Sequence, residues 1–103
     1  MAKLIALYKK PANPAAFDDY YFTRHIPLAK KIRQLRGYEV NATPLATPAG
    51  PSETYHLAAI LSFDSMADLQ AALGSPEGAA TAADLGNFAS GGVELLFFDT
   101  KEV

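Results

Sequence analysis

The residues best suited to chemistry lie in the stretch from Tyr20 to Ile32, which reads YYFTRHIPLAKKI and contains one of the two histidines. An imidazole titrates near neutral pH, so His25 can act as a general acid or base. It can equally serve as a structural residue that bonds the backbone carbonyl left without a donor by Pro27. Tyr21 precedes His25 by one helical turn and either offers a hydroxyl beside it or simply packs. We predict that His25 moves a proton and that Tyr21 orients the substrate.

Further aromatic and polar residues are candidates for lining a ligand pocket beside this pair. They are Tyr8, Phe22, His56 and Phe97. His56 has a simpler alternative as a polar residue at the end of a strand, and Tyr20 is expected to pack with its hydroxyl at the surface. No carboxylate or histidine stands at a spacing that would support a metal site with the two histidines, so we predict neither a metal nor another cofactor.

The composition narrows the class of protein. The chain has 103 residues, no cysteine and a net charge of -2, and half of its residues are hydrophobic. One domain over residues 1–103 is expected, and the charge argues against nucleic-acid binding. The lack of cysteine favours a reducing, cytoplasmic location, and no apolar run is long enough for a signal peptide or a membrane span. The sequence also lacks glycine-rich phosphate-binding motifs and a GxSxG motif.

A helix has to position His25. Asn13 and Pro14 are a good N-cap and first helical residue, and Pro27 predicts a break into two helical segments. Proline disfavours the helical conformation of Ile26, so the segments are expected to meet near residues 24–27 and to free the carbonyl of Thr23. An uninterrupted helix would place His25 at the edge of the apolar stripe, which consists of Phe17, Tyr21, Leu28, Ile32 and Leu35. The second segment is expected to end at Gly37.

Four apolar runs and two further helices complete the predicted fold. Strands are expected at residues 3–9, directly after Gly37, at 55–64 and at 93–99, with a proline-rich loop at 41–54. Ser65 and Ser75 are predicted caps of helices that begin after them. This β-α-β-β-α-β order predicts an α+β, ferredoxin-like antiparallel sheet with its helices on one face.

The predicted strands are apolar on both faces of the sheet. The strand at 55–64 alternates between the set His56, Ala58, Ile60 and Ser62 and the set Tyr55, Leu57, Ala59, Leu61 and Phe63. A sheet with one face in water should instead carry polar residues on that face. We therefore predict a homodimer that packs sheet against sheet.

The chain resembles the EthD family of the dimeric α+β barrel superfamily over nearly its whole length. The resemblance rests on NPAAFDDYYFTRHIPLAKKI, LRGYEV, YHLAAILSFDSMADLQAAL and SPEGAATAADLGNFASGGVELLF. The family motif H-x-P-L matches His25, Pro27 and Leu28. The resemblance implies a dimer with a cleft between helices and sheet, and a small planar or hydrophobic substrate. Superfamily members include cofactor-independent monooxygenases, cyclases, isomerases and haem-degrading enzymes.

Two functions of different classes follow from these observations. The first is a small homodimeric enzyme of the cyclase, isomerase or cofactor-independent oxygenase type, which transfers a proton on a small hydrophobic or aromatic compound. The second is a non-catalytic protein that binds a hydrophobic ligand or assists a pathway that degrades xenobiotic compounds. A haem protein with His25 or His56 as axial ligand is a third and less favoured alternative.

Overall fold

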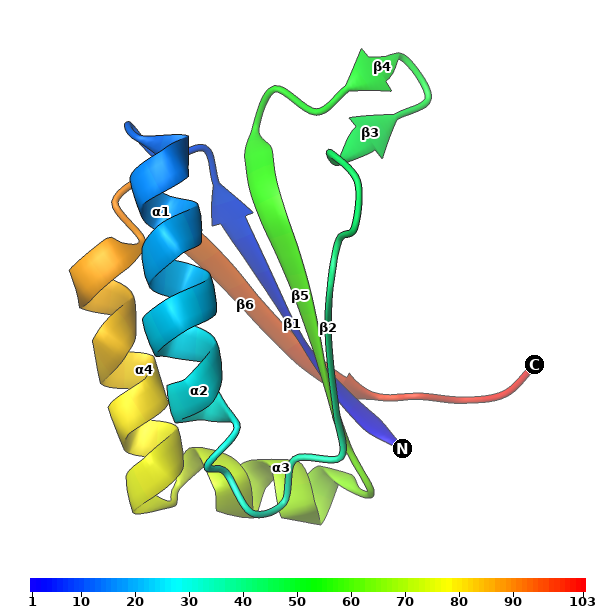
Figure 1. The fold of residues 1–103 in the computed structure, drawn as a ribbon. Helices are drawn as coiled ribbons and strands as arrows, with labels where there is room; N and C mark the ends of the chain where they lie inside the picture. The colour runs from blue at the N-terminus through cyan, green and yellow to red at the C-terminus, as the bar shows by residue number, and fades with distance from the viewer.

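The computed structural model describes residues 1–103 and contains a four-stranded antiparallel sheet with strand order β2-β5-β1-β6 (Figure 1). The helices cover one face of this sheet. The elements are β1 (Ala2–Lys9), α1 (Pro14–Tyr20), η1 (Tyr21–His25), α2 (Ile26–Ala29), β2 (Gly37–Val40), β3 (Ala46–Thr47), β4 (Gly50–Pro51), β5 (Tyr55–Phe63), α3 (Met66–Leu73), α4 (Pro76–Phe88) and β6 (Val93–Asp99). The predicted ferredoxin-like α+β fold is confirmed, with the short β3–β4 hairpin added inside the predicted loop.

The core lies between the helices and the central strands β1 and β5. Alternate residues of β1 are buried, and the buried set is Ala2, Leu4, Ala6 and Tyr8. They lie opposite Phe63, Leu61, Ala59 and Leu57 of β5, which are buried as well. Because residues directly opposite each other in a sheet share a face, this register defines the face that the helices cover.

The helix that carries His25 is continuous, so the predicted break at Pro27 is wrong. Ile26 keeps a helical conformation, with φ -58° and ψ -48°. A π-helical segment, η1, precedes the proline, and within it Ile26 donates its N–H to the carbonyl of Tyr21, five residues back. A wide turn of this kind absorbs the irregularity that a proline introduces into the hydrogen-bond ladder.

The π-helical segment also changes which residues of this helix are buried. Phe17, Tyr21, His25 and Ala29 are all buried at spacings of four residues. In an α-helix each step of four overshoots a full turn by about 40°, and the wider π turn takes back part of this rotation. His25 therefore lies within the buried line instead of at its edge.

The helix that carries His25 also ends earlier than predicted. Helix α2 ends at Ala29, well before Gly37, and single turns follow in which Lys31 and Ile32 bond to carbonyls three residues back. Ile32 is still buried, as the apolar stripe predicts. The predicted caps are confirmed, because the side chains of Asn13, Ser65 and Ser75 accept bonds from Ala16, Asp68 and Gly78.

A β-bulge at the start of β5 reverses two predicted side-chain directions. Tyr8 lies opposite Leu57 and Lys9 lies opposite Tyr55, so His56 is the extra residue of the bulge. His56 contacts Phe17 and Asp18 on the helix side, with its Nε2 atom 2.7 Å from the Asp18 carboxylate. Tyr55 instead bonds Glu94 of β6, which lies opposite Leu7. The regular alternation predicted the opposite side for both residues, because a bulge adds one residue to the count.

The other face of the sheet has no helix over it and carries an apolar patch. We call this the open face; its apolar members are Ile5, Leu7, Ala58, Ile60, Leu96 and Phe98. Leu96 and Phe98 are about half exposed. None of the helices combines the length and the apolar character that a membrane span requires.

The contact between α3 and α4 leaves no room for a side chain at Gly78. A Cβ atom at this position would lie 1.9 Å from the carbonyl oxygen of Ala72. We predict that Gly78→Ala lowers the free energy of unfolding by about 1–3 kcal/mol, measured by urea denaturation, because the backbones must separate.

Gly86 provides the matched control in the same helix. A Cβ atom there meets nothing within 4 Å. Gly86→Ala is expected to raise the free energy of unfolding by about 0.5–1 kcal/mol, because alanine is the better helix former. Equal effects of the two substitutions would contradict the tight helix contact.

Candidate active site

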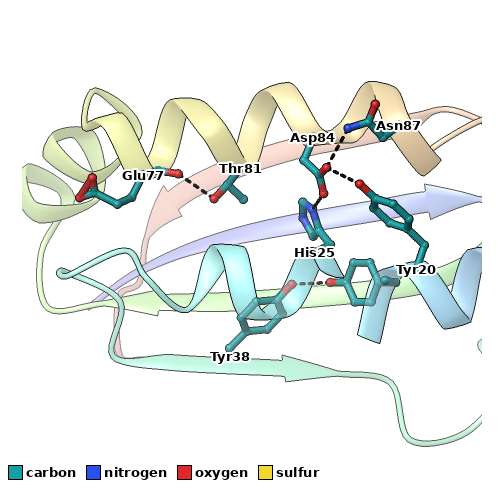
Figure 2. A network of polar contacts seen from close by, with 8 residues as sticks. Tyr20, His25, Tyr38, Glu77, Thr81, Asp84 and Asn87 are labelled. Carbon is teal, nitrogen blue, oxygen red and sulfur yellow. Dashed lines mark hydrogen bonds and ion pairs between the residues drawn. The ribbon is translucent and has the colours of Figure 1, made fainter. Parts of the chain in front are cut away.

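His25 of η1 and Asp84 of α4 form a buried pair between the two helices (Figure 2). The Nδ1 atom of His25 lies 2.9 Å from Oδ2 of Asp84. His25 is 3% exposed and Asp84 is 9% exposed. The second carboxylate oxygen accepts bonds from the Tyr20 hydroxyl at 2.6 Å and from the Asn87 side-chain amide at 2.9 Å. Asp84 is thereby held by three donors from two helices.

These bonds determine the ionisation of the pair. Burial opposes the charge of Asp84, yet the hydrogen bonds from Tyr20, Asn87 and His25 together hold the pKa of this carboxyl below its ordinary value. Burial lowers the pKa of His25, and the hydrogen bond to Asp84 opposes this effect without cancelling it. At neutral pH the pair is therefore a carboxylate and a neutral imidazole.

A carboxylate can only accept, so the neutral imidazole must carry its proton on Nδ1. This leaves the lone pair of His25 on Nε2. The Nε2 atom has no hydrogen-bond partner. Every fully buried side-chain nitrogen or oxygen of the protein does have one. Nε2 is consequently not fully enclosed by the protein, and His25 is one of the residues that line a cavity. An unbonded, neutral imidazole nitrogen of this kind is suited to act as a general base.

The space that His25 lines is an apolar cavity of about 80 Å³ between the helices and the sheet. Hydrophobic residues make up 14 of its 17 lining residues, and no lining residue carries a formal charge at neutral pH. Leu73 and Leu95 line it as well and are 41% and 49% exposed, so the cavity opens to the surface beside them. Such a cavity fits an uncharged, largely apolar molecule.

Three tyrosine hydroxyls lie near this cavity. Tyr8 and Tyr38 line it, whereas Tyr21 is fully buried and stacks against the ring of His25 at 5.3 Å. The hydroxyl oxygens of Tyr21 and Tyr38 are 2.6 Å apart. Burial is the main cause that raises the pKa of all three phenols, so they stay protonated at neutral pH.

The site residues predicted from the sequence lie in different parts of the structure. Tyr8 shares the cavity with His25. His56 and Phe22 line a second, more polar pocket of about 330 Å³, where His56 pairs with Asp18. Phe97 is 48% exposed on the edge strand β6 and lines neither of these pockets. The structural alternative for His25 is wrong in detail, because its partner is Asp84 and not the carbonyl of Thr23.

Four residues of the site were not predicted from the sequence: Asp84, Asn87, Tyr20 and Tyr38. Asp84 is 59 residues from His25 along the chain. One signal for it exists: Asp84 lies four residues before Phe88 in an alanine-rich helix, on the face that helical spacing buries. An acidic residue on a buried face requires a partner, which could have drawn attention to it. Tyr20 was expected at the surface, but its hydroxyl bonds Asp84.

Comparisons with known proteins place the chain in a family. The family model described as EthD domain matches residues 9–92. An uncharacterized 11.0 kDa protein of the thcB-thcC intergenic region of Rhodococcus erythropolis is 40% identical over 103 residues, which cover 100% of this chain and 98% of that protein. The crystal structure of an EthD family protein from Bacillus halodurans has 36% identity and a TM-score of 0.88, and the match covers 98% of this chain and 99% of that one.

More distant structures share the fold. Hydroxynitrile lyase from Passiflora edulis has 16% identity and a TM-score of 0.77, with 99% of this chain and 94% of that chain covered. A dimeric ferredoxin-like protein of unknown function from Thermobifida fusca has 17% identity and a TM-score of 0.69, with 96% and 90% covered. The family match and the two closer relatives extend over nearly all of the sequence, and the chain belongs to the EthD domain family.

Proposed function

We propose that the chain is an enzyme that removes a proton from a small hydrophobic substrate, with His25 as the general base and Asp84 as its positioning residue. The observation that carries the proposal is the buried imidazole of His25, whose Nδ1 is held by Asp84, whose Nε2 has no partner in the protein, and which lines an apolar cavity. The hydroxynitrile lyase that shares the fold is an enzyme for a small molecule, which agrees with this proposal without identifying the reaction.

The proposed step is a transfer of one proton. The C–H bond of the substrate breaks, its hydrogen passes to Nε2 as a proton, and the electron pair stays on the substrate. The imidazolium that forms is stabilised by the Asp84 carboxylate 2.9 Å from Nδ1. Return of the proton to the same carbon gives exchange, and return to another carbon gives isomerisation or assists cyclisation. Tyr21 does not line the cavity, so it would act on the substrate only through Tyr38.

A carbon acid in heavy water provides the test. 2-Butanone, acetonitrile and nitroethane are small, uncharged probes with an acidic C–H bond, and incorporation of deuterium into each can be followed by NMR. The proposal predicts exchange above the buffer rate for at least one of them. Protein-dependent binding of these probes with exchange at the buffer rate would instead support the alternative of a non-catalytic binding protein.

We also propose that two copies of the chain pack through their open faces. The open face leaves Leu96 and Phe98 about half exposed, and a partner would cover them. The ferredoxin-like protein from Thermobifida fusca that shares this fold is dimeric, which supports the proposed assembly without identifying the face.

A charged side chain introduced on the open face tests the proposed dimer. Leu96→Lys is expected to convert the dimer into a monomer, measured by sedimentation at equilibrium, because the interface would bury an unpaired ammonium group. Ala80→Lys, on the exposed side of α4, is the control and is expected to leave the molecular mass unchanged. A monomeric wild-type protein, or a Leu96→Lys variant that is still dimeric, would contradict the proposed interface.

A further inference from the structure

The hydroxyls of Tyr8, Tyr21 and Tyr38 belong to one cluster of tyrosines beside the cavity. The hydroxyl oxygens of Tyr21 and Tyr38 are 2.6 Å apart, and the rings of Tyr8 and Tyr21 pack edge to face with their centroids 5.4 Å apart. Either hydroxyl can be the donor in the bond between Tyr21 and Tyr38. Tyr8 and Tyr38 line the cavity, whereas Tyr21 is fully buried.

The phenol protons determine what is left for a ligand. Burial raises the pKa of Tyr8 and of Tyr38, so both phenols carry a proton at neutral pH. The hydrogen bond among the three hydroxyls joins Tyr21 to Tyr38, so it does not use the proton of Tyr8, and the proton of Tyr38 is free as well when Tyr21 donates. At least one neutral O–H group can therefore donate to a molecule that enters the cavity.

We propose that the two cavity-lining phenols of this tyrosine cluster, Tyr8 and Tyr38, form an oxyanion site and that the substrate is a small, uncharged carbonyl compound with a C–H bond next to the carbonyl. The inference rests on the proposed role of His25 as the base. Removal of the proton leaves an enolate, whose negative charge gathers on the carbonyl oxygen. A donor that is already in place at that oxygen stabilises the transition state more than the ground state.

The lining of the cavity supports an uncharged substrate. No lysine or arginine lines it, so a carboxylate that entered would lose its hydration without gaining a partner. A cavity of about 150 Å³ can hold a benzene molecule, so about 80 Å³ suits a group of roughly three non-hydrogen atoms. A longer substrate would extend past Leu73 and Leu95 to the surface.

Deuterium incorporation into 2-butanone by hydroxyl-deletion variants tests the inference. In each single variant, Tyr8→Phe or Tyr38→Phe, the other cavity-lining phenol is kept and can donate, so each should lose less than about 10-fold in exchange rate. The double variant has no cavity-lining phenol and should lose about 10²-fold, the usual effect of removing an oxyanion donor. The loss in the double variant should therefore exceed the product of the single losses.

Tyr55→Phe is the matched control, because this hydroxyl lies on the open face and bonds Glu94 at 2.6 Å. It is expected to keep the wild-type exchange rate. Thermal unfolding of each variant establishes that it is folded at the assay temperature. Pyruvate, which bears a carboxylate beside its carbonyl, is expected to show no exchange above the buffer rate.

The outcomes separate this inference from the proposed function. Exchange that depends on His25 but is the same in the double tyrosine variant would overturn the oxyanion site and leave the base intact. Exchange of pyruvate as fast as that of 2-butanone would overturn the substrate class. Exchange of acetonitrile or nitroethane without exchange of 2-butanone would support the base and contradict the carbonyl substrate. No His25-dependent exchange of any probe would refute the proposed function itself.

Discussion

Replacement of His25 by glutamine is expected to slow deuterium exchange by about 10²–10⁴-fold for any carbon acid that the wild-type protein exchanges. This is the usual contribution of a general base. Glutamine keeps a polar side chain of similar length, but its amide cannot take up a proton at neutral pH. The apolar lining of the cavity and the tyrosine hydroxyls stay in place, so binding of the probe should change much less than the rate.

The pH dependence of the rate should identify the same group. The base must be neutral, and burial lowers the pKa of His25 from its ordinary value of 6.5. The rate should therefore be constant above pH 6.5 and fall only as the pH drops through the lowered pKa. The groups that face this imidazole are Asp84 of α4 and the neutral Tyr21 of its own helix.

His56→Gln provides the decisive comparison for this prediction. His56 pairs with Asp18 in the second pocket, away from the apolar cavity. A larger loss of rate from His56→Gln than from His25→Gln would move the chemistry to the second pocket and contradict the assignment of the base. A rate that rises as the pH falls would contradict it too, because protonation removes the lone pair.

Replacement of Asp84 by asparagine is expected to have the second large effect, on both rate and stability. The side chain keeps its size, but its NH₂ group must face Tyr20, Asn87 or His25, which all donate to Asp84 in the wild type. If the amide donates to Nδ1, the proton of the imidazole moves to Nε2 and the base is lost. We expect a rate loss of at least about 10²-fold and a loss of about 1–3 kcal/mol in the free energy of unfolding.

Asp18→Asn is the matched control, since Asp18 also holds a histidine through a carboxylate. Its side chain is 49% exposed, compared with 10% for Asp84, so water can replace the lost bond. We expect its effect on the free energy of unfolding to stay below about 1 kcal/mol. Equal destabilisation by the two substitutions would contradict a larger contribution of the buried Asp84 network to the free energy of unfolding.

The same network predicts how acid affects the wild-type protein. The pKa of His25 is lowered in the folded state, so the unfolded state takes up a proton first and stability falls as the pH drops from about 6.5. The pKa of Asp84 is lowered too, which gives stability above its ordinary pKa of 3.8 that is lost as the pH falls through the folded value. Urea denaturation at several pH values should show that Asp84→Asn lacks the second loss but keeps the first, because the carboxylate that it removes acts to raise the pKa of His25.

Local chemistry explains what the sequence could predict. The caps at Asn13, Ser65 and Ser75 depend on side chains within three residues, and the strands depend on apolar runs that any neighbouring strand would bury. The order of the elements then led to the ferredoxin-like sheet. His25 was recognised because a histidine beside a proline is unusual in a helix, and the H-x-P-L motif resembles that of the EthD family.

The features that were missed depend on contacts between distant segments. The π-helical segment before Pro27 turns Tyr21 and His25 into the core. This packing depends on distant parts of the chain, so no local sequence pattern predicts it. The bulge at His56 adds one residue to β5 relative to β1, and only the pairing of the strands reveals it. Asp84 can be identified as the partner of His25 only when α4 packs against η1 and brings its carboxylate to the imidazole.

The protonation of His25 in the ligand-free protein is the most direct test of the central claim. The nitrogen chemical shifts of the two histidine rings can be followed by NMR as the pH is changed, and His56→Gln identifies the signals of His25. We predict a neutral ring with its proton on Nδ1 at pH 7 and a pKa below 6.5. A proton on Nε2, or a His25 ring that is still charged at pH 7, would contradict the account.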